Sequence, residues 1–219
     1  MLGCVPSATE HDRVRTSYNA VAREYAARFR DELAQKPLDR ALLTALVEQT
    51  EKAAPIADLG CGPGHVAGWL ADQGVAAVGI DLSPRMIEIG QAEHPQVEFR
   101  QGDLLSLPAS DGEFGSLVSF YSIIHLNASE LCPAFREVRR TLRPSGLFLV
   151  AFHVGSEVRH LTEWHGHEVD VAFHFFEPET VIEALVDAAF VVEARLERAN
   201  YPEEGDTRRG FVLARRQSS

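Results

Sequence analysis

Short apolar runs alternate with helical periodicities along most of the chain. Five such runs, at residues 55–59, 76–80, 96–100, 115–120 and 146–152, have the length of strands. Each is almost continuously apolar, which is typical of parallel strands covered on both faces of a sheet. The stretches between them repeat their apolar residues every three or four positions, as helices do. This pattern predicts an α/β fold around a mostly parallel sheet.

Apolar positions near both ends of the chain add to this sheet. Helical spacing occurs twice before the first strand, within residues 18–29 and 38–47, and predicts an N-terminal helical cap over residues 1–50. Near the other end, apolar and polar residues alternate on either side of a turn at 201–207. We expect these two segments to close the sheet as an antiparallel hairpin, which makes it seven-stranded.

The composition indicates a single domain over residues 1–219. Of its residues 45% are hydrophobic, enough for one core. The net charge of -11 argues against nucleic-acid binding, because phosphate contacts need a basic face. Cys4, Cys61 and Cys132 are too few and too scattered for a disulfide framework, so we expect free thiols. Without an apolar run of about 18 residues or a leader pattern, a cytoplasmic protein with no membrane partner is expected, as monomer or homodimer.

A glycine-rich turn follows the first predicted strand. Gly60, Gly62 and Gly64 come directly after the run that starts at Ile56, so a buried strand turns sharply into a helix and leaves the backbone bare for a ligand. Asp81 ends the next strand, about 20 residues later, where a carboxylate binds the two hydroxyls of a ribose. Together these features predict a cofactor that contains adenosine.

The spacing around this turn separates three classes of cofactor. A phosphate-binding P-loop needs Lys and then Ser or Thr after its last glycine, but His65 and Val66 follow here. The dinucleotide pattern G-x-G-x-x-G is replaced by G-x-G-x-G, with Asp58 two residues before it. A carboxylate there would repel a pyrophosphate and suits the ammonium group of S-adenosylmethionine.

With these motifs, residues 18–149 resemble the class I S-adenosylmethionine-dependent methyltransferases, and among them the small-molecule branch that includes the ubiquinone and menaquinone biosynthesis enzymes. Asp58 and the three glycines match the family's first motif, Asp81 its ribose acid, and Asp103 the acid that binds the adenine amine. The turn at 142–147 is a fourth match, and Gly115 departs from the family's usual Asp. The resemblance implies a Rossmann-like fold.

The resemblance also implies a set of cofactor contacts. Leu82 would cover the adenine face and Met86 would pack beneath it, although Met86 also suits a helix core. Tyr18 and Tyr25 match a tyrosine segment that folds over the cofactor in related enzymes, and equally suit a packed aromatic pair. The full set is Tyr18, Tyr25, Asp58, Gly60, Cys61, Gly62, Asp81, Leu82, Met86, Gly102, Asp103, Leu104, Ser119 and Phe120.

Methyl transfer from a sulfonium is an in-line displacement, so the protein mainly supplies alignment and, for O–H or N–H acceptors, a place for the proton. We expect His125, after the fourth strand, to take the proton with Tyr121 as its orienting partner, and His153 as second choice. A histidine packed in the core is the alternative for His125. Residues 152–176 form an insertion with five histidines and several aromatic residues, which predicts a lid that selects a planar or apolar acceptor.

No metal is predicted, because His160, His165 and His167 match no metal-ligand spacing and suit polar positions on the lid. The leading hypothesis is methyl transfer to an oxygen or nitrogen of a small molecule. Carbon methylation of a quinone-like or natural-product substrate and a non-catalytic cofactor-binding subunit remain open, and Asp58 disfavours an NAD-dependent oxidoreductase.

Overall fold

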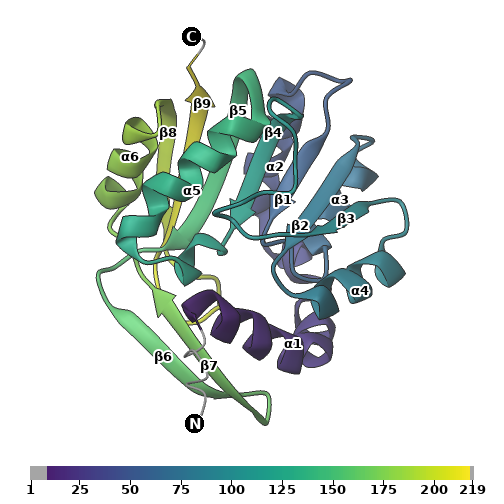
Figure 1. Ribbon diagram of the computed structural model, residues 1–219, viewed down its shortest axis with the longest axis vertical. Coiled ribbons are helices and arrows are strands. Elements are labelled where there is room, and N and C mark those ends of the chain that lie inside the picture. The colour runs from purple at the N-terminus through teal and green to yellow at the C-terminus, as the bar shows by residue number, and fades with distance from the viewer. Residues whose placement is uncertain (1–8, 218–219) are drawn as a thin grey trace, which may run out of the picture.

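Seven strands form one sheet in the order β3-β2-β1-β4-β5-β9-β8 in the computed structural model, which describes residues 9–217 (Figure 1). Strands β1 to β5 are parallel, and β9 runs antiparallel to its neighbours β5 and β8. The strands are β1 (Ile56–Leu59), β2 (Ala77–Asp81), β3 (Glu98–Gln101), β4 (Phe114–Phe120), β5 (Leu142–His153), β8 (Phe190–Arg198) and β9 (Arg209–Arg216). The predicted sheet and its closing hairpin are confirmed.

Helices cover both faces of the sheet because successive side chains of a strand point to opposite sides. Ile56 packs toward one face with Leu43 and Leu70, whereas the next residue, Ala57, packs toward the other with Phe135. The first face carries α2 (Pro37–Gln49), α3 (His65–Asp72) and α4 (Pro84–Glu93), and the second carries α5 (Ala128–Thr141) and α6 (Pro178–Asp187). No helix among residues 9–217 is long and apolar enough to cross a membrane.

Helix α1 (Glu10–Phe29) lies across the end of the sheet, packed between β7 (His167–His174) and α4 (Figure 1). A capping box at Thr9 starts the helix, and a short 3-10 turn, η1 (Glu32–Gln35), links it to α2. Both predicted N-terminal helices are present; α2 packs on a face of the sheet, where Leu43 and Leu46 are fully buried in the core. Residues 1–8 of the predicted cap, including Cys4, lie outside the described residues; Cys61 and Cys132 are free thiols.

The predicted insertion forms a separate antiparallel hairpin of β6 (Val158–Trp164) and β7. Val169 and Val171 of the hairpin pack against Val21 of α1. A second 3-10 turn, η2 (Ile123–His125), follows β4 and contacts β7. The hairpin, α1 and η2 therefore stand together beyond the carboxyl ends of the strands, which is where ligands of open α/β sheets bind.

Candidate active site

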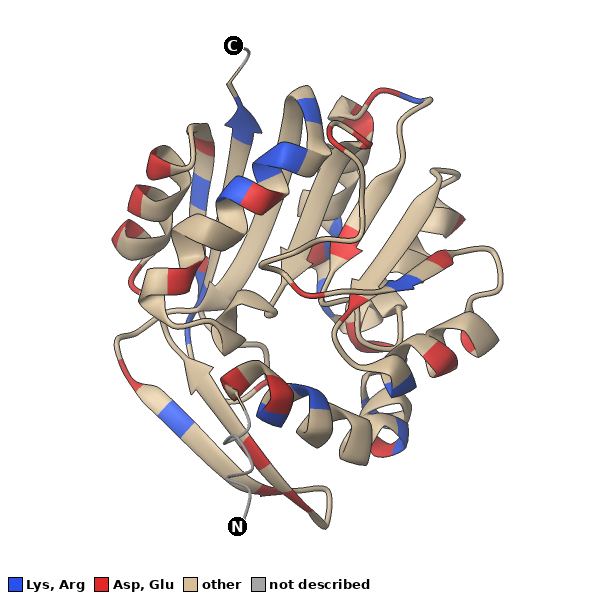
Figure 2. Ribbon diagram, in the orientation of Figure 1, with Lys and Arg blue, Asp and Glu red and all other residues tan. Residues whose placement is uncertain are grey.

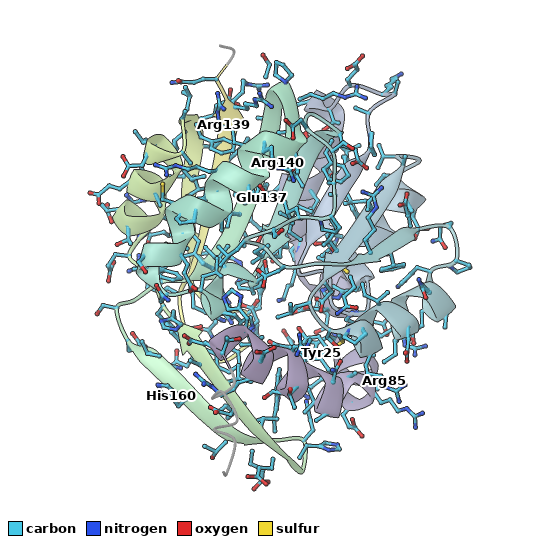
Figure 3. All side chains as sticks on the ribbon, in the orientation of Figure 1. Tyr25, Arg85, Glu137, Arg139, Arg140 and His160 are labelled. Carbon is cyan, nitrogen blue, oxygen red and sulfur yellow. The ribbon has the colours of Figure 1, made fainter. Side chains whose placement is uncertain are left out.

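A cavity of about 860 Å³ lies beyond the carboxyl ends of the central strands, under α1. This volume is in the upper part of the range of about 300–1,000 Å³ that is usual for small-molecule pockets. Tyr25 points from α1 toward this space (Figure 3). Of the predicted residues, the following line it: Tyr18, Tyr25, Gly60, Cys61, Gly62, Asp81, Leu82, Gly102, Asp103, Leu104, Phe120, Tyr121, His125 and His153.

The glycine turn needs its glycines for two reasons. Gly60 and Gly62 have φ angles of 68° and 54°, in the left-handed region that side chains disfavour. A Cβ on Gly60 would also lie 2.2 Å from the Cβ of Ser122, so the turn after β1 packs directly on the segment after β4. At Gly62 the ring of Tyr25 is the nearest neighbour, 3.7 Å from where a Cβ would be. The bare backbone thus lines the cavity under an aromatic ring.

Asp81 joins the glycine turn to the end of β2. Its Oδ2 accepts a hydrogen bond of 2.8 Å from the backbone N–H of Gly62, and its Oδ1 accepts one of 2.7 Å from Ser83. Burial raises the pKa of Asp81 to about 6, against the opposing effect of these two hydrogen bonds. An ionised carboxylate has about four lone-pair sites, so two remain for a ligand.

Asp103 is held by a residue that the sequence did not single out. Its Oδ2 lies 2.8 Å from Nδ1 of His11 on α1, and its Oδ1 accepts 2.8 Å from the N–H of Leu105. Nε2 of His11 lies 3.4 Å from Glu130. Burial acts to lower the pKa of His11, but the hydrogen bond and charge of Asp103 outweigh it and leave that pKa raised. Asp103, the residue predicted to bind the adenine amine, is therefore held to α1 through His11; we call this contact the His11 latch.

Three predicted contacts do not reach the cavity: Asp58, Met86 and Ser119. The Asp58 carboxylate turns to the start of α3, where it accepts 3.2 Å from the N–H of Ala67, and burial raises its pKa to about 7. Met86 is fully buried inside the fold, and Ser119 lies 2.5 Å from the hydroxyl of Ser122. These side chains lie behind the cavity wall, and the Asp58 carboxylate faces the start of α3 and not the cavity.

The prediction that Tyr121 orients His125 is wrong, because the hydroxyl of Tyr18 is the side-chain partner of His125. Its Nδ1 lies 3.3 Å from the carbonyl of Ala172, which can only accept, so Nδ1 carries the proton. Nε2 is then the acceptor for the Tyr18 hydroxyl at 2.9 Å. Burial lowers the pKa of His125 to about 4. The imidazole is therefore neutral near pH 7, and its Nε2 lone pair accepts the hydrogen bond from Tyr18.

His153 lies farther along the cavity. Its Nδ1 is 2.9 Å from the hydroxyl of Thr207, and its ring stacks on Phe175 with centroids 5.0 Å apart. Burial, helped by the charges of Arg209 and Arg159, lowers the pKa of His153 to about 3. The expectation of a histidine base with a pKa near neutrality is thus wrong for both His125 and His153, because each is desolvated.

Tyr121 begins the segment after β4 with a φ of 58°, which is uncommon for a residue with a side chain. Its ring lies 5.2 Å from that of His153, and the cations of Lys36 and Arg209 lie 5.4 and 5.6 Å from its centroid. Sequence reasoning missed Lys36 and Arg209, since neither belongs to a motif. It missed His11 for the same reason.

The hairpin contributes the aromatic side chains of Trp164 and Phe173 to the lining of the cavity. The ring of Trp164 lies 5.5 Å from both Tyr18 and Tyr25 in edge-to-face geometry. His160 lies on the outer, exposed strand of the hairpin (Figure 3). Within residues 9–217 no three His, Cys, Asp or Glu side chains are grouped so as to hold a metal ion.

The arginines of α5 and the end of β9 gather at the opposite end of the sheet from the cavity (Figure 2). Arg140 is paired there with Glu137 and Asp111, at 2.7 and 2.8 Å. Arginines in the last turn of a helix also complement its dipole.

Comparison with known proteins bears on the same residues. Residues 56–146, from β1 to the turn within β5, match a family model described as a methyltransferase domain. A probable S-adenosylmethionine-dependent methyltransferase of Mycolicibacterium smegmatis is 31% identical over 147 residues, which are 64% of this chain and 53% of that protein. Residues 56–146 are thus similar to the class I S-adenosylmethionine-dependent methyltransferases.

Other relatives match smaller shares of the sequence. A demethylmenaquinone methyltransferase of Beutenbergia cavernae is 33% identical over 96 residues, 44% of this chain and 39% of the relative. The chain thus spans about half the length, or less, of the curated relatives it matches.

Solved structures of low sequence identity share the fold. A methyltransferase of Methanosarcina mazei superimposes with a TM-score of 0.71 at 18% identity, covering 78% of this chain and 96% of that one. The cyclase SpnF gives 0.71 at 20% identity and covers 99% and 100%. The Rossmann-like methyltransferase fold is therefore confirmed.

Proposed function

We propose that the chain transfers the methyl group of S-adenosylmethionine to an oxygen or nitrogen of a small-molecule acceptor. One observation carries this proposal: a single cavity joins the glycine turn, Asp81 and Asp103 to the two buried histidines, His125 and His153. A cofactor on the first group of residues would leave the second group to face an acceptor.

The residues around the cavity fit such a cofactor. The two lone-pair sites of Asp81 that the backbone leaves free suit the two hydroxyls of a ribose. Leu82 and Leu104 offer apolar surface beside it, and Asp103 offers its carboxylate to an amine in place of His11. Tyr25 packs over the bare backbone of Gly62, where its ring excludes water from the arm that carries the sulfonium.

Methyl transfer asks three things of the protein: alignment, exclusion of water and removal of a proton. When bound, S-adenosylmethionine supplies an electrophilic methyl group. Tyr18, Tyr25 and Trp164 form the aromatic wall that keeps water out. Neutral His125 can accept a proton through Nε2, and Tyr18 now occupies that lone pair. Since a pKa of about 4 makes His125 a weak base, it would hold the acceptor's proton only briefly and pass it on to solvent.

Carbon methylation is the second candidate. The specific observation in its favour is the 33% identity to the demethylmenaquinone methyltransferase of Beutenbergia cavernae, which extends over 96 residues. The polar far end of the cavity, with Lys36, Glu204 and Arg209, supports an acceptor with polar groups over a long apolar one.

The test is a search for transferred methyl groups. The protein would be incubated with S-adenosylmethionine carrying a trideuterated methyl and with a library of small metabolites, and products would be read by mass spectrometry. We expect at least one metabolite to gain the labelled methyl, with loss of the signal in Asp81→Ala and retention in the exposed control His160→Ala. Binding of the cofactor with no labelled product in any fraction would favour a non-catalytic cofactor-binding subunit.

A further inference from the structure

The far end of the cavity contains a buried guanidinium with little neutralising charge. Arg209 is the first residue of β9, and its side chain is 5% exposed and lines the cavity. Its Nη1 donates to the carbonyl and hydroxyl of Thr207, and its Nη2 donates 3.4 Å to the carbonyl of Gly205. Nε is buried and has no partner among residues 9–217. The three oxygens that accept these hydrogen bonds, two from Thr207 and one from Gly205, are all uncharged.

The nearby carboxylates are committed to other cations. Glu204 lies 3.8 Å from Arg209 but 2.6 Å from Arg198 and 2.9 Å from Lys36. Asp39 is 3.2 Å from Arg198, and the remaining acid near Lys36 is Glu32, at 2.5 Å. A buried charge is costly unless it is paired. Among the three cations Lys36, Arg198 and Arg209, only Arg209 lacks a carboxylate within 3.2 Å.

Tyr121 carries a second buried polar atom without a hydrogen-bond partner, next to Arg209. Its hydroxyl is buried without a hydrogen-bond partner in the part of the chain that the structure describes, and its ring faces the guanidinium of Arg209 at 5.6 Å. Its φ of 58° adds backbone strain, and strained residues concentrate at ligand sites. A phenol and an Nε–H can both donate, so the missing ligand atom is a hydrogen-bond acceptor.

We propose that Arg209 and Tyr121 form a subsite for a carboxylate of the methyl acceptor. The inference rests on the proposed function and narrows its substrate class to small organic acids. Neither donor atom is exposed in this structure, so a side-chain rotation would have to bring Nε of Arg209 and the hydroxyl of Tyr121 to the two carboxylate oxygens. The charge of the carboxylate would then offset the guanidinium. Tyr121, Lys36 and Arg209 would then be specificity residues, distinct from the His125 and Tyr18 pair.

Sheet geometry assigns this subsite to the acceptor and not to the cofactor's own carboxylate. The glycine turn follows β1, whereas Arg209 begins β9, three strands away in the order β1-β4-β5-β9. At about 4.8 Å between neighbouring strands, the two strands are about 14 Å apart. The aromatic rings of Phe120 and Tyr121 lie between them at the end of β4.

The test compares organic acids with their neutral amides. Benzoate, 4-hydroxybenzoate and cinnamate would be titrated against the full chain saturated with S-adenosylhomocysteine, each beside its amide, and binding would be followed by saturation-transfer NMR and calorimetry. We expect each acid that binds to be favoured over its amide by about tenfold or more, as charged hydrogen bonds imply. Tyr121→Phe should reduce that preference by about tenfold, and Arg209→Gln should abolish it.

Measurements of unfolding distinguish a ligand-binding role of Tyr121 from a purely structural one. Tyr121→Phe removes a hydroxyl that has no partner, so its unfolding midpoint should equal or exceed that of the wild type. The matched control is Tyr201→Phe, since the Tyr201 hydroxyl accepts 3.3 Å from the N–H of Leu38. That control should be less stable and should keep the same ratio of acid to amide affinity.

Three results would overturn the proposal: equal binding of acids and amides, no saturable binding of any acid, or an unchanged preference in Tyr121→Phe. If the S-adenosylhomocysteine affinity alone falls in Tyr121→Phe, the subsite belongs to the cofactor and the proposal is wrong. Failure of the wild type to bind S-adenosylhomocysteine would refute the proposed function. Titrations of the acids without cofactor still measure the acid preference in that case, so the two failures can be told apart.

Discussion

At the residue scale, Tyr18 and His125 meet across the cavity although 107 positions separate them in the chain. The carbonyl of Ala172 fixes the protonated nitrogen of the imidazole, and burial keeps the ring neutral. A hydroxyl and a neutral imidazole in contact can pass a proton without leaving a buried charge for long. This pair, and not Tyr121, is the first candidate for handling the acceptor proton.

We predict that His125→Ala and Tyr18→Phe each lower turnover, by about 10²-fold for His125→Ala, with little change in cofactor affinity. Because the pKa of His125 is about 4, the wild-type rate should show no ionisation of this residue near neutral pH. Stopped assays with the identified acceptor measure both, with the exposed His160→Ala as control. Full activity in both variants would mean that the proton leaves directly to water.

Asp58 offers a second test at this scale. Its folded pKa of about 7 exceeds the ordinary value of 3.8, so the neutral form is favoured in the fold. The contribution of protonated Asp58 to the free energy of unfolding is fully present below pH 3.8. It is lost as the pH rises from 3.8 through about 7. Asp58→Asn keeps an acceptor for the Ala67 N–H and cannot ionise, so its free energy of unfolding should exceed that of the wild type by about 1 kcal/mol or more at pH 8.

Urea unfolding across this pH range measures the difference between Asp58→Asn and the wild type. The gap should be smallest near pH 4 and should grow until about pH 7. A variant less stable than the wild type at pH 8 would show that Asp58 is held there as a stabilising carboxylate.

At the element scale, α1 and the β6 and β7 hairpin cover the cavity from one side. Asn19 of α1 accepts 2.7 Å from the hydroxyl of Ser83 and 3.3 Å from the N–H of Arg85, so the helix is tied to the start of α4. His11 adds the latch to Asp103, and Val21 packs on the hairpin. A ligand that binds the Oδ2 of Asp103 therefore has to displace His11 of this cover.

We predict that the His11 latch weakens with rising pH. The pKa of His11 is raised above 6.5, so the stabilisation from its charge is fully present below pH 6.5 and is lost as the pH rises through the folded value. His11→Gln should lower the free energy of unfolding by at most about 1 kcal/mol below pH 6.5, because the pair is partly exposed, and by less at alkaline pH. Urea unfolding of His11→Gln and the wild type, once below pH 6.5 and once at alkaline pH, measures this loss, with His160→Gln as control. A loss that grows with pH contradicts the ion pair.

Hydrogen exchange tests whether the cover moves. Lids are drawn from the less stable parts of a fold, so amide exchange in α1 and in residues 158–174 should slow when S-adenosylhomocysteine is added. Helix α6, on the far face of the sheet, is the internal control and should not change. Protection confined to the glycine turn would identify α1 and the hairpin as ordinary packing.

At the scale of the whole molecule, local patterns predicted the elements but not the long-range contacts. The short apolar runs and the turn at Gly60 locate β1 to β5 and the cofactor end, because these depend on neighbours in sequence. The direction of the Asp58 carboxylate, the neutral state of His153 and the entry of Arg209 into the cavity depend on residues brought together by folding. No spacing rule encodes them.

Isothermal titration calorimetry tests the cofactor assignment most directly. The wild-type chain should bind S-adenosylmethionine and S-adenosylhomocysteine and give no heat with NAD. Asp81→Ala removes the carboxylate that holds Gly62 and Ser83 and that we propose binds the ribose, so it should weaken cofactor binding by about 1.5–3 kcal/mol, or about tenfold or more. Heat with NAD and none with S-adenosylmethionine would contradict the account.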